Sequence, residues 1–244
     1  MNILVVNDDG IDAKGLSILA KAASYHGSVF VAAPKVQQSA KSASITYFGH
    51  IEVEEVEPIF GSVRTIVVDG TPADCVRLGV KVFEQEFDLV LSGINHGVNL
   101  AMDVQYSGTV AAAFEASIMG LNAIAFSAAD IDLDYIFDET VKLLDEIIDN
   151  ELYLDTDILN INYPHQSFKK VLGARLTAMG LRIQHSEFIK TDKPNEYRIL
   201  SSNVFVKEGD DADMTAFNAG YVSITPLQLD RTDYKKLKKV FNKS

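Results

Sequence analysis

The sequence contains few residues of several types, and each shortage excludes a kind of site or a class of protein. Cys75 is the only cysteine among 244 residues, so an intramolecular disulfide and a cysteine-rich metal site are excluded. No apolar run reaches the length of a membrane span, and residues 1–6 carry no basic leader, so we expect a cytoplasmic protein without membrane contact. Only 22 lysines and arginines stand against 34 aspartates and glutamates, a formal charge of −12. That balance disfavours a protein that binds nucleic-acid polymers through their phosphates.

Apolar residues, in contrast, make up 47% of the chain, enough for the core of one large domain or of a domain with an elaboration. In the first part of the chain, short apolar runs typical of buried strands alternate with amphipathic patterns typical of helices. The strand patterns are 3–6, 28–33, 66–68, 89–91 and 123–126, and the helical patterns are 13–24, 73–83, 110–119 and a stripe of Phe137, Val141, Leu144 and Ile148. This alternation predicts βαβ units, and hence an α/β fold with a largely parallel sheet flanked by helices.

The pattern changes near residue 157, where helical periodicity gives way to successive strand patterns. These strand patterns are 158–163, 171–177, 183–190, 197–205 and 221–225, with a hairpin connection at 191–195. We therefore predict two portions, 1–157 and a β-rich elaboration of antiparallel character at 158–244. The tail at 234–241 has an apolar stripe among lysines, which favours a basic helix docked on an acidic body, its own or a partner's. A short helix on a membrane surface is the alternative.

Two adjacent carboxylates, Asp8 and Asp9, follow the first predicted strand. Residues 3–6 form an unbroken apolar run, which predicts a central strand buried on both faces of a parallel sheet. Ligands of such sheets bind outside the carboxyl ends of the strands, so both side chains should stand at the mouth of the crevice. Neighbouring carboxylates repel each other unless a cation compensates them, and oxygen ligands suit Mg²⁺ or Mn²⁺. From these residues alone, a simple tight turn at Asp9-Gly10 is an equally good interpretation.

Two later segments follow predicted strands and fall where the crevice is expected. The loop at 37–44 supplies several hydroxyl groups, among them Ser39, and one lysine, although taken alone it is best interpreted as a polar linker. Residues 92–99 are predicted to form a glycine-rich turn after the fourth strand. Within this turn, Asn95 and Asn99 offer neutral amide groups that can serve a metal ion or a phosphate.

Two further segments precede predicted helices. Ser107 and Thr109 stand just before a run of helix formers, where they can cap the helix. The same geometry exposes N–H groups at the positive end of the helix dipole and makes an anion site, and both roles can hold at once. In the segment 70–76, Cys75 has no identifiable base to activate it as a nucleophile, so we expect a buried apolar role.

These segments occur together in an order that resembles one known family. The residues that carry the resemblance are Asn7-Asp8-Asp9-Gly10, Ser39, Gly70-Thr71-Pro72 with Asp74-Cys75-Val76, Ser92-Gly93-Ile94-Asn95 with Gly97 and Asn99, Tyr106-Ser107-Gly108-Thr109-Val110, and Gly220-Tyr221-Val222-Ser223-Ile224-Thr225-Pro226-Leu227. They span nearly the whole chain and resemble the stationary-phase survival protein SurE family. Some of these motifs are weak singly, but together they are highly specific.

Members of the SurE family are metal-dependent 5′/3′-nucleotidases that act on nucleoside monophosphates, and some also degrade short polyphosphate. The resemblance therefore implies one divalent ion per subunit, Mg²⁺ or Mn²⁺. The implied metal ligands are Asp8, Asp9, Ser39 and Asn95. The implied phosphate-binding residues are Asn99, Ser107, Gly108 and Thr109. The resemblance further implies a Rossmann-like catalytic portion at 1–157 and a portion at 158–244 that exchanges elements between subunits, giving a homodimer or homotetramer.

The chain departs from the family at three positions near the metal-binding serine. Lys35 stands where an acidic residue is usual, Gln38 where an arginine is usual, and Ala40 where a glycine is usual. These changes leave the implied metal ligands intact, and they bear on substrate preference and loop mobility. His96 lies inside the asparagine-rich turn, and we assign it no catalytic role.

The expected reaction is attack by metal-associated water on a phosphate monoester, with release of a nucleoside and inorganic phosphate. Asp8 and Asp9 are the candidate catalytic residues, and the choice of general base between them stays open. An aspartyl-phosphate phosphatase is disfavoured because the alternating Asp-x-Asp arrangement of such enzymes is missing here. The alternative to an enzyme is a nucleotide-sensing or stress-interaction module that binds its ligand without turnover.

Overall fold

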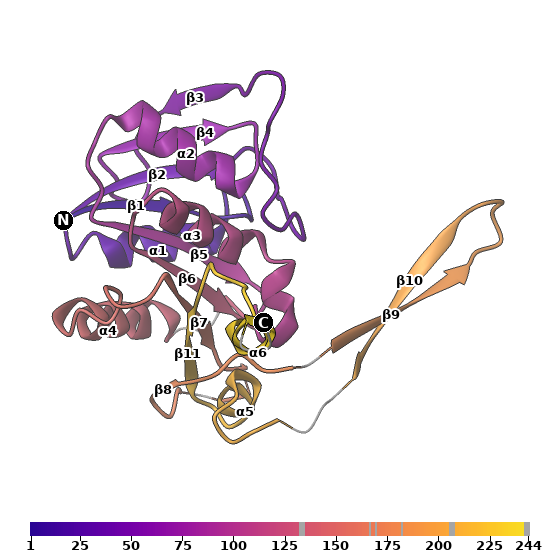
Figure 1. Cartoon of the computed structure of the whole chain (residues 1–244). Coiled ribbons are helices and arrows are strands. Elements are labelled where there is room, and N and C mark those ends of the chain that lie inside the picture. Colours follow the sequence, from indigo (N-terminus) through magenta and orange to yellow (C-terminus); the bar gives the residue numbers. More distant parts are fainter. Residues whose placement is uncertain (132–134, 166, 169, 182, 205–207, 242–244) are drawn as a thin grey trace.

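The structure is a computed structural model of the chain, and it describes residues 1–131, 135–165, 167–168, 170–181, 183–204 and 208–241. Its largest element is a nine-stranded sheet with the strand order β3-β4-β2-β1-β5-β6-β7-β11-β8 (Figure 1). The strands of this sheet are β1 (Asn2–Val6), β2 (Ser28–Pro34), β3 (Val53–Val56), β4 (Arg64–Val68), β5 (Leu89–His96), β6 (Ala123–Ala128), β7 (Ile158–Tyr163), β8 (Ala174–Leu176) and β11 (Val222–Leu227). Two more strands, β9 (Ile183–Lys190) and β10 (Tyr197–Val204), form a separate antiparallel hairpin.

Six neighbouring strands, β4-β2-β1-β5-β6-β7, are parallel throughout. Numbered along the chain without the edge strand β3, they have the order 3-2-1-4-5-6 of a doubly wound Rossmann-like sheet. The predicted α/β fold with a largely parallel sheet is therefore confirmed. The strand order reverses between β1 and β5, and ligands of such sheets bind at the carboxyl ends of the strands beside this reversal.

Helices cover both faces of the parallel strands (Figure 1). On one face these are α1 (Lys14–Ala23) and α4 (Ile136–Asp149), and on the other α2 (Pro72–Phe83) and α3 (Gly108–Ile118). Successive residues of β1 point alternately to the two faces, so Ile3 and Val5 join the first core while Leu4 and Val6 join the second. All four side chains are fully buried, as the unbroken apolar run predicted.

The strand β5 is longer than predicted. We expected a strand at 89–91 followed by a glycine-rich turn, and that boundary is wrong because the strand continues to His96. The register between β5 and β6 shifts before Asn95, so an irregular strand delivers this residue to the carboxyl end of the sheet. Gly93 permits the irregularity, because its φ is 135° and a Cβ there would lie 2.3 Å from the carbonyl oxygen of Phe126.

Several short elements also differ from the predictions. The strand expected at 171–177 contains only β8, and the last residue of the strand expected at 197–205 lies outside the described residues. Three short elements were not predicted, namely β3, the 3-10 helix η1 (Ala101–Gln105) and α5 (Asp213–Asn218). The last two depend on tertiary contacts, because Leu100 and Ala101 pack with Met214 and Phe217 in a small core of their own.

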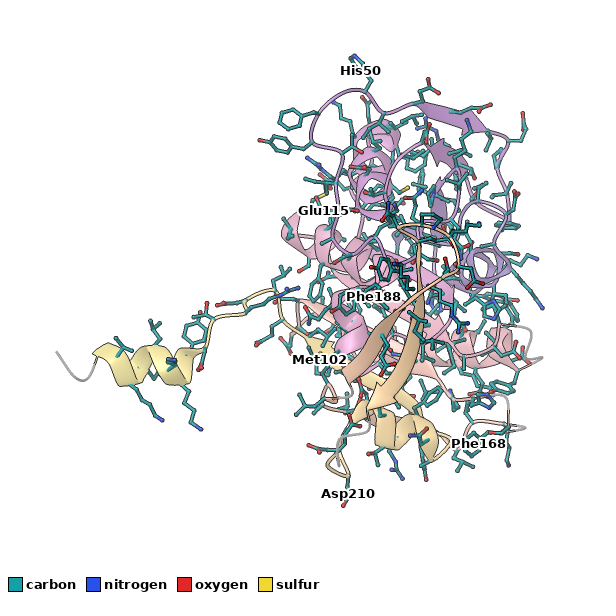
Figure 2. The ribbon with its side chains drawn as sticks, turned by 90° about the vertical axis from the view of Figure 1, so that its right-hand side faces the viewer. His50, Met102, Glu115, Phe168, Phe188 and Asp210 are labelled. Carbon is teal, nitrogen blue, oxygen red and sulfur yellow. The ribbon has the colours of Figure 1, made fainter. Side chains whose placement is uncertain are left out.

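The C-terminal portion both completes the sheet and projects from it. β7 and β11 are antiparallel neighbours, and the hairpin β9–β10, whose connection was predicted, extends away from the body (Figure 1). α6 (Tyr234–Phe241) projects as well (Figure 2), and residues 231–240 are all exposed, so docking of the basic tail on its own body is not observed. Docking on a partner, the division at residue 157 and a role of 158–244 in oligomerisation stay predictions. Within the described ranges, no helix has the length and apolarity needed to cross a membrane.

Candidate metal and phosphate site

Asp8 lies directly beyond β1, beside the reversal of strand order, and only 4% of its surface is exposed. Its Oδ1 accepts a hydrogen bond of 2.5 Å from the hydroxyl of Thr109, which is fully buried in the first turn of α3. The carbonyl oxygen of Asp8 accepts from the backbone N–H of Gln38 at 2.7 Å. Asp8 is therefore tied through its carboxylate to helix α3 and through its backbone to the loop after β2.

Burial raises the pKa of Asp8 to about 6 from its ordinary value of 3.8, because a buried carboxylate loses the hydration of its charge. The hydrogen bond from Thr109 opposes this rise, and the negative charge of Asp9 adds to it. No lysine or arginine in the described part of the chain contributes to this pKa. A divalent cation would relieve such a buried carboxylate, which has a second carboxylate beside it and no positive partner.

Asp9 is anchored through both of its carboxylate oxygens. Oδ1 accepts a hydrogen bond from Nε2 of Gln37 at 3.1 Å, and Oδ2 accepts one from the backbone N–H of His96 at 3.0 Å. These bonds tie the end of β1 to the loop after β2 and to the end of β5. Only the backbone of His96 takes part in them. The turn of Asp9 and Gly10 is thus built into a wider junction of three segments.

A cavity of about 590 Å³ opens beside Asp8 at the carboxyl ends of β1 and β5. Five of the eight residues predicted for the site line it, namely Asp8, Ser39, Asn95, Asn99 and Ser107. These five residues come from four segments that are distant from one another in the sequence, and the fold brings them to one cavity. The other three do not line the cavity. Asp9 is bonded as described above, and Gly108 and Thr109 lie against Asp8.

The mouth of the cavity also has apolar surface. Tyr106 lines it, with 64% of the side chain exposed, and so does Ala40 in the loop after β2. Ile199 of β10 lines it from the hairpin, whose other strand, β9, contacts η1. The sequence did not suggest Ile199, because we assigned the portion at 158–244, which contains the hairpin, to oligomerisation. Apolar groups at the mouth and oxygen atoms inside suit a ligand with one polar and one flat apolar end.

Helix α3 begins directly against Asp8. Ser107 caps it, because its hydroxyl accepts a hydrogen bond of 3.1 Å from the backbone N–H of Val110, so the predicted capping role is confirmed. Gly108 leaves the necessary space, since a Cβ there would lie 3.0 Å from both Cβ and Oδ2 of Asp8. The helix runs for 11 residues, and the positive end of its dipole lies beside the cavity, where it favours an anion.

The donor set fits a hard divalent cation. Inside the cavity, the carboxylate of Asp8, the hydroxyl of Ser39 and the amide of Asn95 offer oxygen atoms, which Mg²⁺ and Mn²⁺ prefer, and the carboxylate of Asp9 follows Asp8 directly in the sequence. Nδ2 of Asn95 donates to the carbonyl oxygen of Gly97 at 2.7 Å, which leaves the amide oxygen as its ligand atom. Among the described residues, no three His, Cys, Asp or Glu side chains form a metal-binding group, and Cys75 is buried in the core. Softer ions therefore lack suitable ligands in that part of the chain.

Comparison with known proteins identifies the family of the chain. A family model described as Survival protein SurE matches residues 3–186. The chain belongs to the SurE family. It is 39% identical to the 5′-nucleotidase SurE of Legionella pneumophila, covering 96% of this chain and 94% of that protein. It is 36% identical to the 5′-nucleotidase SurE of Alkaliphilus metalliredigens, covering 99% and 98% of the two chains. The crystal structure of the SurE protein from Aquifex aeolicus matches with a TM-score of 0.84 at 34% identity, over 100% of both chains.

The three residues that depart from the usual SurE pattern differ in their backbone conformation, contacts and exposure. Ala40 has a φ of 57°, in the left-handed region that the usual glycine adopts without penalty, so this chain accepts some strain beside Ser39. Gln38 contributes its backbone N–H to Asp8, which any residue except proline supplies. Lys35 is exposed and does not line the cavity.

Sequence reasoning missed the residues that hold Asn99 in this SurE site. They are Ser127 on β6 and Asn160 and Asn162 on β7, all three fully buried. A signal for two of them was present, because asparagine is disfavoured in strands and yet Asn160 and Asn162 alternate with apolar residues in β7. Gln37, which holds Asp9, had no such signal, since polar residues are ordinary in an exposed loop.

Proposed function

We propose that this SurE protein is a divalent-metal-dependent phosphomonoester hydrolase that releases phosphate from nucleoside 5′-monophosphates, with 3′-monophosphates and short polyphosphate as further substrates. The observation that carries the proposal is the cavity where Asp8, Asn95 and the N-terminus of α3 meet. A pair of carboxylates suits a cation and a helix N-terminus suits an anion, so together they suit a metal-bound phosphate. Relatives that match over nearly their whole length are named 5′-nucleotidase SurE.

The metal-binding half of the site would hold one divalent ion per subunit, Mg²⁺ or Mn²⁺, through Asp8, Asp9, Ser39 and Asn95. When bound, such an ion lowers the pKa of a coordinated water and neutralises charge on phosphoryl oxygens. Oδ1 of Asp8 accepts the hydroxyl hydrogen bond of Thr109, and this carboxylate lines the cavity that would hold the ion. The hydrogen bonds from Gln37 and from the backbone of His96 hold Asp9 in a fixed orientation for the same purpose.

The phosphate-binding half would use the start of α3 and Asn99. The hydroxyl of Ser107 accepts from the helix backbone and can still donate its own proton to a phosphate oxygen. Nδ2 of Asn99 uses one hydrogen for Ser127 and has a second for phosphate. The hydroxyl of Thr109 is committed to Asp8, so we assign Thr109 to positioning this carboxylate in place of a direct phosphate contact.

The deciding experiment measures inorganic phosphate released from adenosine 5′-monophosphate. Protein stripped with a chelator should release none, and addition of Mg²⁺ or Mn²⁺ should restore turnover. Asp8→Asn and Asp9→Asn should abolish the restored activity. The matched control is Asp12→Asn, which neutralises an exposed carboxylate of the same segment and should keep full activity. Binding of the nucleotide without phosphate release in either ion would reject the enzyme and favour a nucleotide-sensing module.

A further inference from the structure

Strand β7 contains two asparagines, Asn160 and Asn162, whose side chains hold the backbone of Asn99. Oδ1 of Asn162 accepts a hydrogen bond of 2.8 Å from the N–H of Asn99, and its Nδ2 donates to the carbonyl oxygen of Asn99 at 3.2 Å. Nδ2 of Asn160 donates to the same carbonyl oxygen at 2.8 Å. Both backbone groups of Asn99 are therefore bonded to side chains of a strand more than sixty residues away.

The side chain of Asn99 is fixed as well. Its Nδ2 donates to the hydroxyl of Ser127 on β6 at 2.7 Å, and this serine is fully buried. Asn99 itself is only 7% exposed, yet it lines the cavity beside Asp8. The orientation of its amide toward the cavity is therefore set by β6 and β7, because all four hydrogen bonds of Asn99 described above are made with side chains of these two strands.

This arrangement is costly for a buried strand. Asparagine is disfavoured in strands, and burying an amide is unfavourable unless its groups are hydrogen-bonded. Oδ1 of Asn160 has no hydrogen-bond partner in the described structure, although it is buried. Apolar residues at Asn160 and Asn162 would pack β7 without that penalty. The hydrogen bonds to Asn99 offset part of this unfavourable burial, and they connect both asparagines to a residue that lines the cavity. This connection points to a role in the site.

We propose that Asn160 and Asn162 are positioning residues of the phosphate site and act through Asn99. The proposal rests on the function proposed above, in which Asn99 contacts the phosphate. Fixing the backbone and the amide before the ligand arrives spares the loss of conformational freedom on binding, so phosphate binds more tightly. The C-terminal portion of the chain thereby shapes the site through β7.

The test measures binding of inorganic phosphate to the Mn²⁺-loaded protein by calorimetry, together with binding of Mn²⁺ alone. Asn162→Leu removes both bonds to Asn99 at similar volume, and phosphate binding should weaken about tenfold with unchanged Mn²⁺ affinity. Ser127→Ala is the milder second variant and should weaken phosphate binding about threefold. The matched control is Thr140→Val, which deletes a buried bond of 2.8 Å to Tyr163 of the same strand and should change neither affinity.

The Asn99→Ala background separates the possible outcomes. There, Asn162→Leu should cause no further loss of phosphate affinity, because the group that it positions is gone. An equal loss in both backgrounds, or a parallel loss of Mn²⁺ affinity, would overturn the inference. So would normal phosphate binding in both Asn162→Leu and Ser127→Ala when Asn99→Ala is impaired. Normal phosphate binding in Asn99→Ala itself would overturn the assignment of Asn99 along with the inference, whereas the proposed activity is judged separately by turnover.

Discussion

Asp8→Asn should make the metal-free protein more stable at neutral pH, although it removes a proposed metal ligand. Asp8 is almost fully buried, and burial raises its pKa from 3.8 to about 6. A carboxyl whose pKa is higher in the folded protein than in the unfolded chain costs folding free energy once it ionises. That rise corresponds to about 3 kcal/mol, a cost that an uncharged amide does not have. Asparagine also keeps an oxygen that can accept the hydrogen bond from Thr109.

The difference in stability between Asp8→Asn and the wild type should increase as the pH rises. Well below pH 3.8, Asp8 is protonated in the folded and unfolded chains alike, so the wild type has its full stability. As the pH rises from 3.8 to about 6, the unfolded chain releases a proton that the folded protein still holds, and the wild type loses stability. Above that range the loss is complete. The advantage should therefore grow from about 0.5 kcal/mol near pH 4 to about 3 kcal/mol at pH 8.

Urea unfolding with a chelator present, repeated between pH 4 and pH 8, measures this difference. Asp12→Asn is the matched control, because it neutralises an exposed carboxylate of the same segment, so no comparable gain is expected. Adding Mn²⁺ at about a hundred times its Kd should stabilise the wild type by about 2.7 kcal/mol and leave Asp8→Asn unchanged. A metal-free wild type that is more stable than Asp8→Asn at pH 8 would refute the reasoning.

Two further substitutions test the walls of the cavity. Gly108→Ala places a Cβ 3.0 Å from Asp8, so phosphate release should fall about a hundredfold while circular dichroism shows the helices intact. Wild-type turnover would contradict the close packing. Tyr106→Ala removes an exposed ring that can stack on a nucleobase, so KM for adenosine 5′-monophosphate should rise about tenfold with KM for glycerol 2-phosphate unchanged. Equal rises for both substrates would instead place the ring near the phosphate.

The parallel sheet was predictable because its central strands have strong local signals. Residues 3–6 are apolar without interruption, and a strand buried on both faces requires this composition. The position of Asp8 at the crevice then followed from topology, since the carboxyl ends of parallel strands share one edge. The end of β5 was not predictable in the same way. A glycine such as Gly93 is typical of turns and of strand irregularities alike, and only its contact with β6 decides between them.

The residues that support the site were harder to predict, because their partners are distant in sequence. Thr109 is 101 positions from Asp8, and Asn162 is 63 positions from Asn99. Capping already explains a serine or threonine at the start of a helix, so the sequence gives no sign that such a residue also bonds to a distant side chain. Ser107 has the cap that such a position predicts, whereas Thr109 turns its hydroxyl to a carboxylate from another element.

The hydrogen bond from Thr109 to Asp8 links the two halves of the proposed site. Burial alone would raise the pKa of Asp8 further, and the bond from Thr109 limits that rise to about 6. Asp8 is therefore mostly ionised at neutral pH, and a cation meets little competition from a proton. The helix that offers its N-terminus to phosphate thus also prepares the carboxylate that would bind the cation. Gly108 completes this link, because only a residue without a side chain lets the start of α3 approach Asp8 so closely.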